Sequence, residues 1–207
     1  KIMETYSFNT AKYGTHSLIA EEIGENKAVL DVGCNKGYLK LLADRNEFYG
    51  IDFDQNDLEE ARRTGYEDVF KLDLNRYEEF VCDRTFDVIV FADVLEHLMH
   101  PQDVLAFFLK KHLKEGGKVI ISLPNVANIA IRIGLLFGKF DYTENGILDK
   151  THFHLYTKRS AQAFIESVGL RIVKKKFSSN RLGRIIELFP WMGGLFGFNL
   201  IFVCQKK

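Results

Sequence analysis

The 207-residue chain lacks several features that mark specialised classes of protein. Its three cysteines, Cys34, Cys82 and Cys204, stand far apart without a C-x-x-C pair, which argues against a disulfide framework or a zinc knuckle and suits a reducing cytoplasm. No apolar run approaches the roughly 18 residues needed to cross a bilayer. Lysine plus arginine equals aspartate plus glutamate at 28 each, so no overall basic field recruits nucleic acid. We therefore expect a cytoplasmic protein without a nucleic-acid partner.

Short apolar runs alternate with amphipathic stretches along the chain. Runs typical of strands cover residues 28–32, 47–51, 69–72, 86–91, 118–123, 170–174 and 200–204. Apolar residues at helical spacing cover residues 15–23, 37–43, 56–63, 104–113 and 157–168. Strands that alternate with helices predict an α/β fold, in which a parallel sheet is covered by helices on both faces.

Ligands of such sheets bind beyond the carboxyl ends of the strands, where the strand order reverses. The sequence places these ends at residues 31–37, 52–54, 73, 92–97 and 122–125. Acidic residues occur at four of the five places, so the chemistry of the chain is expected at an acid-rich edge of the sheet.

Residues 29–37 (VLDVGCNKG) read as a strand, a glycine turn and the start of a helix. Gly33 and Gly37 let the backbone approach a ligand closely, and the free N–H groups of the helix start attract its polar end. A dinucleotide fingerprint would need glycines where Asp31 and Lys36 stand. A carboxylate would repel a pyrophosphate but attract the ammonium and sulfonium groups of S-adenosylmethionine.

Two further acids follow at the ends of the next strands. Asp52 comes 21 residues after Asp31, a spacing at which a carboxylate can accept both ribose hydroxyls of a nucleotide. Phe53 is expected to lie against the adenine, and Asp73 to accept a hydrogen bond from its amino group. Each signal alone is weak, but the three in this order indicate an adenosine site.

Five segments together resemble the class I S-adenosylmethionine-dependent methyltransferases. They are D-x-G-C-x-x-G at 31–37, G-I-D-F-D at 50–54, L-D-L at 72–74, F-D-V-I-V-F-A-D-V-L-E-H-L at 86–98 and G-G-K-V-I-I-S-L-P-N at 116–125. The resemblance covers roughly residues 15 to 175. It implies a single-domain Rossmann-like fold with a seven-stranded, mostly parallel sheet and helices on both faces. It also implies cofactor contacts at Asp31, Gly33, Asn35, Gly37, Asp52, Phe53, Asp73, Leu74 and Ala92.

The predicted domain occupies residues 1–207, with a core of about 15–178 and a last strand at 198–206. Its first residue is lysine rather than methionine, which is consistent with a fragment of a longer protein. Two apolar insertions, 125–150 and 180–197, are expected to cover the acceptor site or to form interaction surfaces. Within the second, the apolar segment 182–198 favours contact with a membrane surface or with a second copy in a homodimer, or it completes the core.

Acids and histidines after the fourth strand and near residue 150 predict the acceptor side. In one interpretation His152, His154 or His97 is the general base that takes the proton of a hydroxyl acceptor. In another, Asp93, Glu96, His97 and His152 or His154 hold a divalent metal; a helix starting near Asp93 and an extended segment through both later histidines would bring these side chains together. In a third, the same residues only shape the site wall.

The pattern D-x-x-E-H with a later histidine is similar to the E-x-x-E-H site of two methyltransferase groups, the metal-dependent small-RNA 3′-terminal 2′-O-methyltransferases and the ubiquinone-pathway O-methyltransferases. It departs from that site at Asp93, which stands where the first glutamate is expected. The segment around L-P-N and T-H also looks like bacterial methyltransferases of cell-surface sugar and polysaccharide pathways.

The sequence thus predicts methyl transfer from S-adenosylmethionine to the hydroxyl, or to the amine, of a small-molecule acceptor that is a sugar, a polysaccharide or a lipid-linked compound. An RNA 3′-end 2′-O-methyltransferase that depends on a metal, and a non-catalytic cofactor-binding module that serves a partner, stay open as alternatives.

Overall fold

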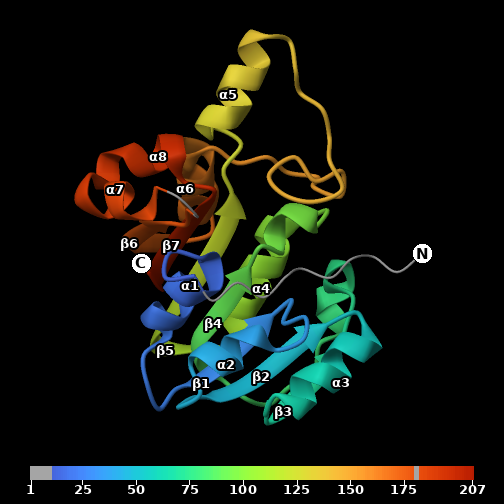
Figure 1. Cartoon of the computed structure of the whole chain (residues 1–207). Coiled ribbons are helices and arrows are strands. Elements are labelled where there is room, and N and C mark those ends of the chain that lie inside the picture. Colours follow the sequence, from blue (N-terminus) through green and yellow to red (C-terminus); the bar gives the residue numbers. More distant parts are fainter. Residues whose placement is uncertain (1–10, 180–181) are drawn as a thin grey trace.

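The computed structural model describes residues 11–179 and 182–207; residues 1–10 and 180–181 of the predicted domain lie outside the described part. One seven-stranded sheet runs through the molecule in the order β3-β2-β1-β4-β5-β7-β6 (Figure 1). All neighbouring strands from β3 to β5 pair in parallel, and β7 pairs antiparallel with both β5 and β6. The predicted Rossmann-like, mostly parallel sheet is confirmed.

The strands are β1 (Ala28–Val32), β2 (Glu47–Asp52), β3 (Asp68–Lys71), β4 (Phe86–Ala92), β5 (Leu113–Pro124), β6 (Leu170–Phe177) and β7 (Asn199–Lys206). The α-helices are α1 (Thr15–Ile23), α2 (Tyr38–Leu42), α3 (Gln55–Arg63), α4 (Pro101–His112), α5 (Ile129–Leu136), α6 (Lys158–Ser167), α7 (Gly183–Leu188) and α8 (Gly193–Phe196). Short 3₁₀ helices are η1 (Leu74–Glu79), η2 (Leu95–His97) and η3 (Pro190–Met192).

The central strands are apolar on both faces because helices cover both sides of the sheet. Residues alternate between the two faces: Leu30 and Ile89 pack in one core cluster with α4 and α6, whereas Val29 and Val88 pack in the other with α1, α2 and α3. Full burial of each such side chain contributes about 1.5–3 kcal/mol to folding. The two cores hold the strand ends in fixed positions.

Two boundaries differ from the sequence prediction. Helix α4 begins at Pro101 rather than Val104, because proline at the first helical position has the right φ and no N–H to leave unpaired. Strand β5 begins at Leu113 rather than Lys118 and runs through Gly116, whose φ is +72°. Glycine at this position accommodates the irregular pairing with β4 between Leu113 and Lys118.

Helix α5 and the loop after it project from the body of the fold beyond the end of β5 (Figure 1). The predicted insertion 180–197 carries α7, η3 and α8 before β7 returns through the sheet. No helix in the described residues has the length and apolar character that crossing a membrane requires.

Candidate functional site

The glycine loop leaves β1 and turns tightly into α2. Gly33 and Gly37 have φ values of +79° and +78°, which L-residues with a side chain rarely adopt. A Cβ at Gly37 would lie 2.5 Å from Thr64 Oγ1 and 3.0 Å from Ala61 Cα. The N–H groups of Gly33 and Cys34 donate to the Ile51 carbonyl, which fixes the loop against β2. The loop is therefore rigid and open to close approach.

Asp31 is buried near the end of β1, two residues before Gly33. Its Oδ2 accepts a hydrogen bond of 2.7 Å from the hydroxyl of Tyr66, while its Oδ1 is buried without a partner among the described residues. Burial, followed by the neighbouring Asp52 charge, raises the pKa of Asp31 to about 7, although the Tyr66 hydroxyl opposes this shift. An unpaired buried oxygen of this kind can accept a hydrogen bond from a ligand.

Asp52 ends β2 beside the loop. Its Oδ2 accepts from the backbone N–H of Asn35 at 2.9 Å, and its Oδ1 accepts from Asp54 N–H at 3.0 Å. Each carboxylate oxygen has a second lone pair, so both can still accept from a diol. The next side chain, Phe53, is 66% exposed, which leaves its ring available for stacking.

The remaining predicted cofactor residues lie at the same edge. Asp73 is exposed and accepts from the backbone N–H of Asn75 at the start of η1. Leu74 is buried in the core cluster on the α4 face of the sheet. Ala92 ends β4, which is the strand next to β1 on the other side from β2.

The strand order reverses between β1 and β4, so the loop, Asp52 and Ala92 lie at the place where α/β sheets bind their ligands. The residues present fit S-adenosylmethionine: a glycine turn without side chains, an unpaired buried oxygen on Asp31, and an acid beside an exposed ring at Asp52 and Phe53. The individual contacts stay predictions. Tyr66, which holds Asp31, was missed because a tyrosine after a helix gives no local signal of that contact.

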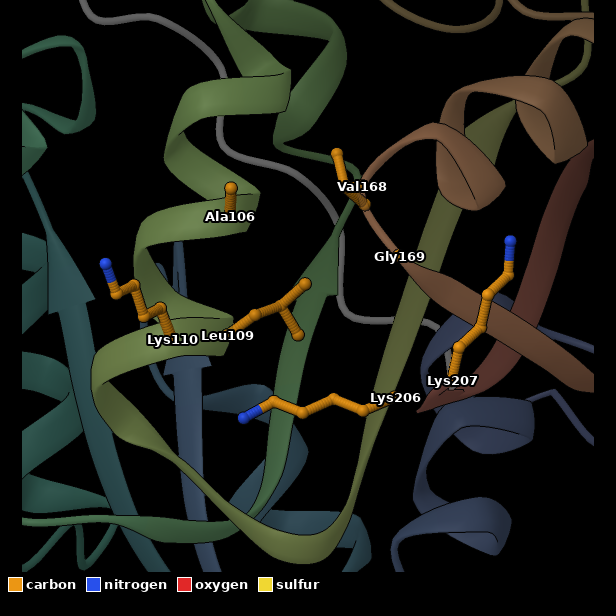
Figure 2. Close-up of a pocket in the computed structure, with 7 residues that line it drawn as sticks. All are labelled: Ala106, Leu109, Lys110, Val168, Gly169, Lys206 and Lys207. Carbon is orange, nitrogen blue, oxygen red and sulfur yellow. The ribbon is translucent and has the colours of Figure 1, made fainter.

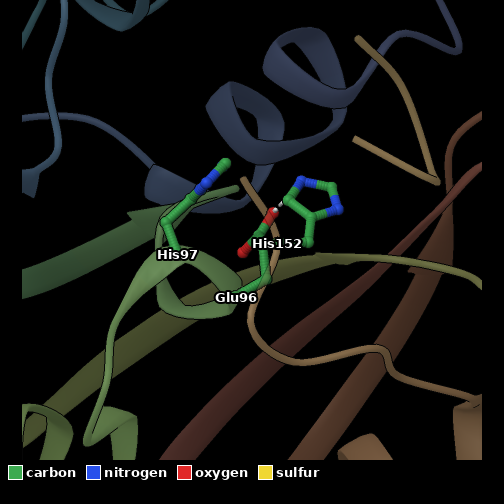
Figure 3. A group of neighbouring side chains, drawn as sticks. All are labelled: Glu96, His97 and His152. Atoms are coloured by element: carbon green, nitrogen blue, oxygen red, sulfur yellow. Dashed lines mark ion pairs between the residues drawn. The ribbon is translucent and has the colours of Figure 1, made fainter. Parts of the chain in front are cut away.

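A second polar group follows β4 and consists of Glu96, His97 and His152 (Figure 3). One ligand atom from each of the three lies within 4.8 Å of the other two. His152 Nε2 is 4.0 Å from Glu96 Oε1, and both side chains are fully buried. The two imidazole rings meet edge to face, with centroids 4.7 Å apart. We call these three residues the Glu-His-His cluster.

A backbone carbonyl and a hydroxyl group determine which nitrogen of each neutral imidazole ring carries the hydrogen. His152 Nδ1 lies 3.1 Å from the carbonyl oxygen of Ile147, so that nitrogen carries the proton and Nε2 presents a lone pair. His97 Nδ1 lies 3.0 Å from Thr151 Oγ1. Since that hydroxyl donates to Asp149 Oδ1 at 2.6 Å, it accepts from His97, whose Nε2 is then the basic nitrogen.

Glu96 adds a buried carboxyl to these two lone pairs. Neither of its oxygens has a hydrogen-bond partner among the described residues. Burial, and secondarily the charge of Asp93, raises the pKa of Glu96 well above its usual value. Burial, and secondarily His152, lowers the pKa of His97. The cluster thus holds hydrogen-bond acceptors that have no donor from the described part of the chain, which calls for a proton, a cation or a ligand donor.

Asp93 does not belong to this cluster, and the four-residue metal set predicted from the sequence is wrong in that respect. Its φ is +51°, and η2 covers only three residues, so no helix carries it to the face of Glu96 and His97. Its Oδ1 accepts from Ser122 Oγ at 2.5 Å and from Asn199 Nδ2 at 2.6 Å. These partners on β5 and β7 hold the carboxylate elsewhere.

His154 is also outside the cluster, contrary to the predicted extended segment. A turn bond from His152 N–H to the Asp149 carbonyl breaks the expected alternation. The N–H groups of Phe153 and His154 then both donate to the Glu96 carbonyl. The ring of His154 lies near Tyr156, with centroids 6.3 Å apart, and of the two imidazoles only that of His152 lies beside the Glu96 carboxyl.

A separate surface hollow lies between α4, the end of α6 and the end of β7 (Figure 2). Its lining includes Lys110, Lys206 and Lys207. Lys206 and Lys207 donate to the carbonyls of Leu113 and Glu166. The hollow is at the opposite edge of the sheet from the loop and offers no group for the chemistry described above.

Comparison with known proteins identifies the family of the chain. A family model described as a methyltransferase domain matches residues 8–175. The chain belongs to this methyltransferase family. The matched range contains the glycine loop, the acids at the strand ends and the Glu-His-His cluster.

Relatives with known names include methyltransferases of different kinds. A ubiquinone biosynthesis O-methyltransferase of Rickettsia akari is 30% identical over 135 residues, which are 63% of this chain and 51% of the relative. A ribosomal protein L11 methyltransferase of Cupriavidus pinatubonensis is 28% identical over 123 residues, or 56% of this chain and 40% of the relative. The chain spans about half the length of the curated relatives it matches.

Solved structures share the fold over almost the whole chain. A S-adenosylmethionine-dependent methyltransferase from Archaeoglobus fulgidus has a TM-score of 0.62 at 20% identity, and the match covers 92% of this chain and 94% of that one. An N-methyltransferase from Bradyrhizobium japonicum, solved with S-adenosyl-L-homocysteine, has a TM-score of 0.63 at 15% identity over 99% and 90% of the two chains. At these identities the likeness establishes the fold.

Proposed function

We propose that this chain transfers a methyl group from S-adenosylmethionine to a hydroxyl oxygen of a small-molecule acceptor. The glycine loop, Asp31 and Asp52 would hold the cofactor, which supplies an activated methyl group when bound. The observation that carries the choice of acceptor is the Glu-His-His cluster. It begins four residues after the end of β4, the strand next to β1, and its free lone pairs accept hydrogen bonds.

A hydroxyl acceptor supplies the missing donor. Its O–H would donate to His152 Nε2, and the oxygen would attack the methyl carbon as the carbon–sulfur bond breaks. The hydroxyl proton passes to the imidazole, so the products are a methyl ether, a neutral thioether and a protonated histidine. Ile147 and Thr151 keep the two rings oriented, and positioning of this kind accounts for most catalysis of methyl transfer.

A divalent cation is the second candidate occupant of the cluster. Glu96 with the Nε2 atoms of His97 and His152 would provide one oxygen and two nitrogens, a donor set that suits Zn, Fe, Co or Mn. The Nδ1 bonds to Thr151 and Ile147 are the outer contacts that metal-binding histidines usually make. A bound cation would lower the pKa of a coordinated hydroxyl.

The negative charge at this edge of the sheet argues against strongly anionic acceptors. The carboxylates of Asp52 and the exposed Asp73 lie at this edge, and negative charge there does not favour a polyanion such as the RNA end considered from the sequence. The names of relatives, among them several O-methyltransferases, support an oxygen acceptor. Sugars, polysaccharides and lipid-linked alcohols or phenols are the candidates we retain.

A coupled assay for S-adenosylhomocysteine release tests the proposal with a panel of catechols, prenylated phenols, sugars and amines. We expect turnover with a hydroxyl compound and a loss of about 10²–10⁴-fold for His152→Ala, the range for removing a general base. His100→Ala, at an exposed histidine on the N-terminal side of α4, is the matched control and should keep full activity.

The same assay distinguishes a metal-free histidine base from a cluster that binds a divalent cation. If the histidine acts as a base without a metal, turnover survives chelation. If a cation is required, the purified protein contains it in proportion to chain, and chelation stops turnover until metal is returned. Turnover of amines alone, or undiminished turnover by His152→Ala, would contradict the proposal.

A further inference from the structure

The arm formed by α5 and the residues up to Lys139 carries apolar side chains that the fold does not cover. No residue of α5, all of which the structure describes, is buried. Leu136 is 81% exposed and Phe137 76% exposed. Lone exposed apolar residues are ordinary, but a contiguous group of this size marks an interaction surface.

The exposed side chains do not share one face of the helix. Successive helical residues point about 100° apart, and Leu135, Leu136 and Phe137 are all exposed. Ile133 adds another exposed position one turn earlier. A flat protein partner would cover one side of such a helix and leave the others in water, whereas a fluid layer can surround it.

A second exposed apolar group lies in the segment that holds the base of the arm. Leu188, Phe189 and Trp191 are 74%, 50% and 75% exposed. Asn128, which caps α5, donates to the Gly197 carbonyl at 2.9 Å, just after α8. The base of the arm is therefore tied to the end of the segment that carries the group from Leu188 to Trp191.

The arm itself carries only positive charges, and the exposed acids Asp141 and Glu144 follow it in the loop, where Glu144 pairs with Lys150. Between Asn125 and Phe140 the charged residues are Arg132 and Lys139, with no acid. Arg184 adds a cation in α7. The acid of the second group, Glu187, is already engaged, since it accepts a hydrogen bond from the Tyr13 hydroxyl at 2.6 Å and lies 3.8 Å from Lys12 Nζ.

We propose that the arm and the group from Leu188 to Trp191 dock the protein on an anionic lipid bilayer. The apolar side chains would enter the interfacial layer, with Trp191 at headgroup depth, while Arg132 and Lys139 contact lipid phosphates. This goes beyond methyl transfer and does not depend on it, because binding to lipid requires neither cofactor nor acceptor.

Vesicle sedimentation tests the docking directly. The protein is mixed with vesicles of phosphatidylcholine alone, or of phosphatidylcholine with an equal part of phosphatidylglycerol. We expect binding to the anionic vesicles, weakened by salt. Leu136→Asp and Phe137→Asp should each weaken it by about tenfold or more, because each removes a side chain from the apolar layer. Val81→Asp, at an 81% exposed position away from the arm, is the matched control.

A separate variant tests how much the positive charge of the arm contributes to vesicle binding. Arg132→Gln should lower binding to anionic vesicles by roughly fivefold, the effect of one basic residue near such a surface, and should leave binding to neutral vesicles unchanged. Circular dichroism verifies that each variant is folded. Failure to bind anionic vesicles, or equal binding by Leu136→Asp, would overturn the proposal. Light scattering that shows a dimer broken by Leu136→Asp, without vesicle binding, would assign the region to a second copy instead.

Discussion

At the scale of single residues, the buried carboxyl of Asp31 is costly to ionise in the protein without a ligand. Its pKa is raised to about 7, against about 3.9 for an unperturbed aspartate. A raised pKa means that the folded state binds the proton more tightly than the unfolded state. Its contribution to stability is therefore full below about pH 4 and is lost as the pH rises toward 7.

Asp31→Asn removes this penalty while it keeps an acceptor for the Tyr66 hydroxyl. We expect a higher melting temperature than for the native chain at pH 8, and a smaller difference at pH 5. Each kcal/mol of added unfolding free energy raises the melting temperature by about 2–4 °C for a chain of this size. Scanning calorimetry at the two pH values measures it. A variant that melts lower at pH 8 would show that the ionised carboxylate is well compensated in the free protein.

Residue-scale prediction from the sequence succeeded where the chemistry is local. Asp31, Asp52 and the two loop glycines lie at the predicted edge because strand ends follow from the apolar pattern. It failed for Asp93, whose partner Asn199 is 106 residues away. A contact across that separation depends on the strand order, with β7 inserted between β5 and β6, which no local pattern in the sequence specifies.

At the scale of elements, the loop between β1 and α2 depends on glycine for two separate reasons. Gly37→Ala combines an unfavourable backbone angle with contacts that are too close, including one with the backbone of Ala61. Gly169→Ala, also at positive φ (+82°), meets nothing within 4 Å. We expect about 1–2 kcal/mol of destabilisation at Gly169 from the backbone alone, and about 1–3 kcal/mol more at Gly37 from overpacking.

Urea unfolding of the two variants measures this difference. Equal loss of stability at both positions would mean that α3 and Tyr66 move aside without resistance, and that the loop is less rigid than the contacts indicate.

Element existence was predicted well, since α1 and β1 have the predicted bounds. The elements beyond β5 were harder to predict from the sequence. The apolar segment 125–140 has helical spacing, but the pattern does not say that α5 stands away from the core. That outcome depends on the tie from Asn128 to Gly197 and on the path of the chain between β5 and α6.

At the scale of the whole molecule, the fold gathers three distinct features at one end of the sheet. The acid-rich edge lies at the reversal between β1 and β4, the Glu-His-His cluster follows β4, and the exposed arm follows β5. Parallel strands make this arrangement natural, because their carboxyl ends meet at a common edge. A lipid-linked acceptor, if the docking proposal holds, would approach from that same end.

The central claim is that this edge binds S-adenosylmethionine through Asp52 and the glycine loop. Calorimetric titration with S-adenosylhomocysteine tests it most directly, with Asp52→Ala and, as control, Asp44→Ala at an exposed acid near the other end of β2. The account predicts binding by the native chain and by Asp44→Ala, and a loss of roughly a hundredfold or more for Asp52→Ala, since each hydrogen bond to a charged group contributes about 1.5–3 kcal/mol. Unchanged affinity in a folded Asp52→Ala variant, or no binding by the native chain, would contradict it.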